Sequence, residues 1–108
     1  MILNQEEKYV LATIGSGMVT AALNEGIISE STYNLYCQQI YYELGTTVDI
    51  IFKKLDVDPF MIIRQMDQEK KNFTKKFFVE VLQRVPTCDA ARYYFASTLE
   101  RGGLVTEI

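Results

Sequence analysis

The apolar residues of this 108-residue chain recur every three or four positions, and no segment alternates apolar and polar residues as a half-buried strand would. Glycine or proline interrupts this spacing at Gly26, Pro59 and Pro86, which are residue types found at helix ends and helix starts. The pattern predicts an all-α fold, a compact single-domain bundle of five or six short helices over residues 1–108. Residues 101–108 are expected to form an extended C-terminal tail.

Short polar side chains mark where the helices should begin. Asn4 and Glu7 have the spacing of a capping box, in which each side chain accepts a hydrogen bond from the other's backbone N–H. The first helix should then end before Gly26, which can adopt the left-handed conformation. The further expected N-caps are Ser29, Thr46 or Thr47 ahead of a short helix through residues 50–55, Asp58, and Thr87.

The sequence leaves two alternatives for the packing of the first helix and two for the number of helices in residues 59–85. Gly15 and Gly17 lie inside the first helical segment, where each costs about 1 kcal/mol relative to alanine. They predict either close approach of another helix or a local kink. The segment 59–85 keeps a helical period throughout, so it forms one long helix or two, with the expected break at residues 71–74.

The helical segment that follows Ser29 is rich in tyrosine and contains no basic residue. Its expected core-facing residues are Tyr33, Tyr36, Cys37, Ile40, Tyr41 and Leu44. The chain has 13 aromatic residues, more than we expect one small domain to bury. We therefore expect Tyr42, Tyr93 and one of Tyr33 or Tyr36 to lie outside the core. Tyrosine is enriched at protein interfaces, so these four are candidate partner-binding residues.

Charge is distributed unevenly along the chain. Residues 1–52 contain one basic and six acidic side chains, whereas residues 53–84 contain eight basic and five acidic ones. Within the basic segment, Lys70, Lys71, Lys75 and Lys76 are candidate contacts for an acidic partner. A solvated helical face with some ion pairs is the simpler interpretation of the same residues. The whole chain is acidic, with a pI of about 4.9, whereas a nucleic-acid-binding domain typically has a high pI and a large basic patch.

The residue types that are missing exclude several kinds of chemistry. There is no histidine, which removes the usual general base near neutral pH and the commonest zinc and iron ligand. Cys37 and Cys88 are 51 positions apart and do not form a metal-binding pair. We therefore expect no cofactor, no metal and no enzymatic activity. We also expect buried, unpaired cysteines, no membrane segment, no signal peptide and a cytoplasmic location.

The leading hypothesis is a small non-enzymatic helical protein that binds another protein as an adaptor, regulator or inhibitor. Small inhibitors from phages and other mobile elements have a similar profile, by analogy only. One alternative is a nucleic-acid-associated regulator that uses residues 53–84. A histidine-free enzyme is the least favoured alternative. The partner's identity is open. We expect a homodimer with Tyr42 or Tyr93 near its contact, because the acidic and basic segments are complementary in charge and the exposed tyrosines supply apolar contact area.

Overall fold

A computed structural model describes residues 2–45, 58–85 and 87–104 of the chain. These residues form five helices and no strand, so the predicted all-α bundle is confirmed. The predicted helix through residues 50–55 and its cap lie outside the described residues. The helices are α1 (Gln5–Asn24), α2 (Glu30–Leu44), α4 (Pro59–Arg64), α5 (Gln68–Gln83) and α6 (Asp89–Arg101).

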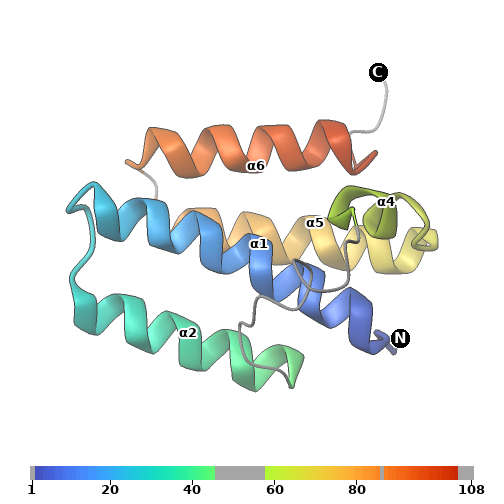
Figure 1. The fold of residues 1–108 in the computed structure, drawn as a ribbon, viewed down its shortest axis with the longest axis horizontal. Coiled ribbons are helices and arrows are strands. Elements are labelled where there is room, and N and C mark those ends of the chain that lie inside the picture. Colours follow the sequence, from blue (N-terminus) through green and yellow to red (C-terminus); the bar gives the residue numbers. More distant parts are fainter. Residues whose placement is uncertain (1, 46–57, 86, 105–108) are drawn as a thin grey trace.

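Helix α1 is the centre of the bundle and contacts each of the other four helices. Helices α2 and α6 lie on opposite sides of α1, and α5 crosses behind it in the view of Figure 1. Because it has neighbours on several sides, α1 is buried around much of its circumference. The largest fully buried side chains of the protein include Leu11 and Met18 from α1, Ile40 from α2, Ile63 from α4 and Phe78 from α5.

The two glycines inside α1 allow other helices to approach it closely. A Cβ atom added at Gly15 would lie 3.2 Å from Cε1 of Phe77 on α5. A Cβ atom at Gly17 would lie 3.2 Å from Cζ of Tyr94 on α6. Both distances are shorter than ordinary van der Waals contact. The close packing predicted from these glycines is therefore confirmed, and each glycine admits one aromatic ring.

Local hydrogen bonds confirm most of the predicted helix starts and ends. The Glu7 backbone N–H donates to Asn4 Oδ1 and the Asn4 backbone N–H donates to Glu7 Oε1, both at 2.8 Å. Ser29 caps α2 by accepting a hydrogen bond from the Thr32 backbone N–H. Gly26, with φ of 74°, follows α1 in the left-handed conformation that favours glycine. Asp58 caps α4 as predicted, with Pro59 as its first residue.

Two predicted boundaries are wrong. The break between α4 and α5 falls at residues 65–67 rather than 71–74, because Asp67 Oδ1 accepts a hydrogen bond from the Lys70 backbone N–H and starts α5 there. Residues 71–74 lie within α5. The N-cap of α6 is Cys88 rather than Thr87, since Cys88 Sγ accepts a hydrogen bond from the Ala91 backbone N–H at 3.3 Å.

The C-terminal end of α6 also differs from the predicted extended tail. Arg101 is the last residue of the helix, and Gly103 has a φ of 67°. The Leu104 backbone N–H donates to the Leu99 carbonyl at 2.8 Å, and the Leu104 side chain is buried. Residues 101–104 therefore form the end of α6 and its closing turn, docked onto the bundle. Residues 105–108 lie outside the described part of the chain.

Candidate protein-binding surface

Helix α2 packs against the bundle along one side only. Tyr36, Ile40 and Leu44, spaced four residues apart, are its buried residues. The opposite side of the helix is exposed to solvent and is called here the outer face of α2. The outer face of α2 consists of Ser31, Asn34, Leu35, Gln38, Tyr41 and Tyr42, all exposed.

The outer face of α2 contains three large apolar or aromatic side chains and no charged one. The exposed fractions are 65% for Leu35, 54% for Tyr41 and 90% for Tyr42. Glu30 and Glu43, the charged residues of α2, lie off this face, about 80° and 140° around the helix from its central residue Gln38.

Helix α5 gives a comparison within the same protein. Four of its eight exposed residues are charged, as on an ordinary solvated helix. Charge depletion combined with exposed tyrosine distinguishes the centre of a protein interface from the rest of a protein surface. The outer face of α2 has this composition and the exposed side of α5 does not. It is therefore the candidate functional surface of the described residues.

The four tyrosines that the sequence singled out fall into different environments. Tyr36 is 7% exposed, and its ring centroid lies 5.5 Å from Cζ of Arg84. Burial raises the pKa of the Tyr36 hydroxyl well above its usual range. Tyr33 is half-buried, and its hydroxyl accepts a hydrogen bond from Thr20 Oγ1 at 3.3 Å. Tyr36 is therefore a core residue, and Tyr33 belongs to the contact between α1 and α2.

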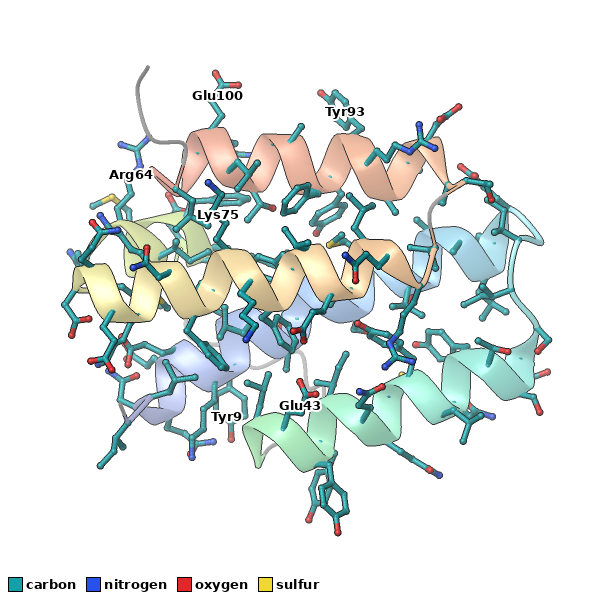
Figure 2. All side chains as sticks on the ribbon, turned by 180° about the vertical axis from the view of Figure 1, so that it is seen from behind. Tyr9, Glu43, Arg64, Lys75, Tyr93 and Glu100 are labelled. Atoms are coloured by element: carbon teal, nitrogen blue, oxygen red, sulfur yellow. The ribbon has the colours of Figure 1, made fainter. Side chains whose placement is uncertain are left out.

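Tyr42 and Tyr93 are exposed, as predicted. Tyr93 is 78% exposed and projects from α6 away from the bundle in Figure 2. Because α2 and α6 lie on opposite sides of α1, these two tyrosines belong to separate surfaces. Tyr41 was expected to face the core and is exposed instead, so that prediction is wrong. The core-facing strip of α2 is narrower than expected.

The four candidate lysines do not form one basic patch. Lys70 Nζ lies 3.0 Å from Glu7 Oε1, and only 21% and 6% of these two side chains are exposed. This ion pair joins the start of α5 to the start of α1. Lys71 is half-buried, whereas Lys75 and Lys76 are exposed. Lys75 projects on the α6 side of α5 in Figure 2, and Lys76 borders the space between α5 and α2.

An open groove of about 280 Å³ separates α2 from α5. Phe73 and Phe77 form its apolar lining, and Glu43, Lys76 and Glu80 provide its polar groups. Glu43 projects from α2 toward α5 (Figure 2). All three charged side chains are exposed, so the groove does not provide the buried environment that tunes a catalytic carboxylate.

Other features bear on cofactors and membranes. Within the described residues, no three acidic or cysteine side chains are grouped closely enough to hold a metal ion. No helix in residues 2–45, 58–85 or 87–104 has the length and apolar character needed to cross a lipid bilayer. Both cysteines are free: Cys37 is half-buried, and Cys88 is buried with Sγ 3.5 Å from Glu25 Oε2.

The sequence pattern placed Tyr42 and Leu35 off the core-facing side of α2, but it did not indicate that Gln38 and Tyr41 lie on the same exposed surface. Leu35, Gln38 and Tyr41 share one side of α2 with Tyr42, at helical spacings of three and four residues. The signal that could have found them is the lack of any charge on the side opposite the apolar strip, since that side of a solvated helix is normally charged.

Comparison with known proteins gives no relative: the chain matches no family model, no curated protein and no solved structure.

Proposed function

We propose that this protein is a non-enzymatic binding protein, which acts as an adaptor, regulator or inhibitor by packing another protein chain against the outer face of α2. One observation carries the proposal. Six exposed residues on one side of α2 include Leu35, Tyr41 and Tyr42 and no charged residue. Water contact with this apolar area is unfavourable, and burial against a partner removes it.

The two alternatives have less support. Binding to nucleic acid would require several free cations on one surface, yet Lys70 is paired with Glu7. Lys75 and Lys76 both border a shallow, open hollow on α5, but Glu80 lines the same hollow, so this surface is of mixed charge. Catalysis would favour a shielded site with tuned groups, whereas the groove between α2 and α5 is open and its charged side chains are exposed.

A cytoplasmic location is part of the same proposal. Cys37 and Cys88 are both free, and free thiols persist in reducing compartments.

The test is capture of partners from an extract of the native host by the tagged full chain. A variant that combines Leu35→Glu and Tyr42→Asp adds two negative charges to the outer face of α2 and should lose the captured partner. The control combines Asn72→Asp and Gln83→Glu, which adds the same charge to exposed positions of α5 and should retain it. If both variants capture the partner equally well, the outer face of α2 is not the functional surface and the proposal is wrong.

A further inference from the structure

We propose that one partner of the outer face of α2 is a second copy of the same chain, with the two α2 helices packed antiparallel about a two-fold axis at Gln38. This inference rests on the proposed function, because it names an occupant for the same surface. It also narrows the expected homodimer to a contact that contains Tyr42 and leaves Tyr93 outside, since α6 lies on the opposite side of α1.

The spacing of the outer face is self-complementary. Leu35 precedes Gln38 by three residues and Tyr41 follows it by three, which is about 4.5 Å along the helix in each direction. A two-fold rotation about an axis through Gln38 therefore places Leu35 of one copy against Tyr41 of the other, and Asn34 of one copy against Tyr42 of the other. The same contact forms twice, as a closed two-fold interface requires.

The hydrogen-bonding groups of this face also match their own copies. The amides of Asn34 and Gln38, and the hydroxyls of Ser31, Tyr41 and Tyr42, can each donate and accept a hydrogen bond. Two identical surfaces of this kind can satisfy each other. A charged residue near the axis would instead meet a like charge, and the face has none. Because the face has no charged side chain, it offers no ion pair to a partner of opposite charge.

The area that the outer face of α2 can bury indicates how large the dimer interface is. An aromatic side chain buries about 150–250 Å² when fully covered, so two tyrosines and a leucine that are already partly covered offer on the order of 400 Å² per copy. A typical stable interface buries about 800 Å² per partner. The interface is therefore at the small end of the range for protein–protein contacts, and the dimer should be weak and depend on concentration.

Sedimentation velocity over a range of micromolar concentrations tests the association. The average mass of the wild-type chain should rise from 12.4 kDa toward twice that value as concentration increases. Tyr42→Asp should weaken association at least about tenfold, or 1.4 kcal/mol. Tyr93→Asp, an equal change at another highly exposed tyrosine, should leave association unchanged. Circular dichroism should give the same helicity for all three proteins.

Cross-linking tests the axis separately. Packed helices lie about 8–10 Å apart, which brings residues on a two-fold axis within disulfide range. In a background with Cys37→Ser and Cys88→Ser, Gln38→Cys should form a covalent dimer under mild oxidation. Asn72→Cys, which is exposed on α5, should not.

Three outcomes would overturn the proposal: a wild-type chain that stays monomeric at high concentration, a dimer that Tyr93→Asp dissociates, or a dimer that Tyr42→Asp leaves intact. A monomer that still loses its host partner through Leu35→Glu and Tyr42→Asp would refute self-association and retain the proposed function. If the chain forms the dimer but captures no other protein, self-association is supported and binding of a different protein at this face is contradicted. The two proposals can therefore fail independently.

Discussion

Replacing Gly15 by alanine should change protein stability with a sign that depends on residue 77. Alanine favours the helix over glycine by about 1 kcal/mol. In the wild type, the new Cβ would lie 3.2 Å from Cε1 of Phe77, so the ring must shift by a few tenths of an ångström. Overpacking of this kind costs about 1–3 kcal/mol. Gly15→Ala should therefore destabilise the wild type by about 0–2 kcal/mol.

The same substitution should stabilise a chain that already carries Phe77→Leu. Leucine lacks the outer ring atoms that approach Gly15, and the remaining neighbour, Cδ1 of Ile40, lies at an ordinary 3.6 Å from the added Cβ. The helix-forming gain of about 1 kcal/mol should then dominate. The interaction energy between the two substitutions is expected to be about 1–3 kcal/mol.

Urea unfolding of the wild type, both single variants and the double variant measures this interaction energy. Thermal unfolding should show it as a shift in Tm of about 4 °C per kcal/mol for a domain of this size. Gly17→Ala is the matched control, because its Cβ would meet Tyr94 rather than Phe77. It should combine additively with Phe77→Leu. An interaction energy below about 0.5 kcal/mol for Gly15 and Phe77 would refute the proposed contact.

Three further predictions follow from individual contacts. Ile40 is 1% exposed, so Ile40→Ala should lower the free energy of unfolding by about 2–5 kcal/mol, and a loss below about 0.5 kcal/mol would place Ile40 outside the core. Asp67→Ala should cost about 1 kcal/mol, because Asp67 caps α5 through the Lys70 backbone N–H, whereas Asp67→Asn should cost less. Burial raises the pKa of Tyr36, so the folded chain keeps this proton at pH values where the unfolded chain has lost it. Stability should therefore fall as pH rises above about 10, the usual tyrosine pKa, and less steeply in Tyr36→Phe; equal slopes would refute the effect of burial.

Helix starts were predictable where the required atoms lie within one turn of each other. Asn4 and Glu7 cap α1 as predicted because each side chain needs only the backbone three residues away. Choosing between neighbouring caps was less successful. Both Thr87 and Cys88 can accept a hydrogen bond, and the buried position of Cys88 in the folded chain favours its sulfur.

The candidate surface was only partly predictable. The sequence identified α2 as rich in tyrosine and placed Ile40 and Leu44 correctly in the core. It did not separate Tyr36, which is buried, from Tyr41, which is exposed. Both lie within about one turn of Ile40, and only the position of the neighbouring helices decides which ring is covered.

Local sequence is sufficient to predict the helical class, most of the caps and the lack of histidine chemistry. These properties depend on residue identity and on contacts within about four positions. Helix packing, in contrast, determines that Lys70 pairs with Glu7, 63 residues away, and does not remain free in a basic patch. It likewise decided that Phe77 fills the space left by Gly15, and that one side of α2 stays uncovered. Such contacts depend on how whole helices pack, because burial at one position is set by side chains distant in the sequence.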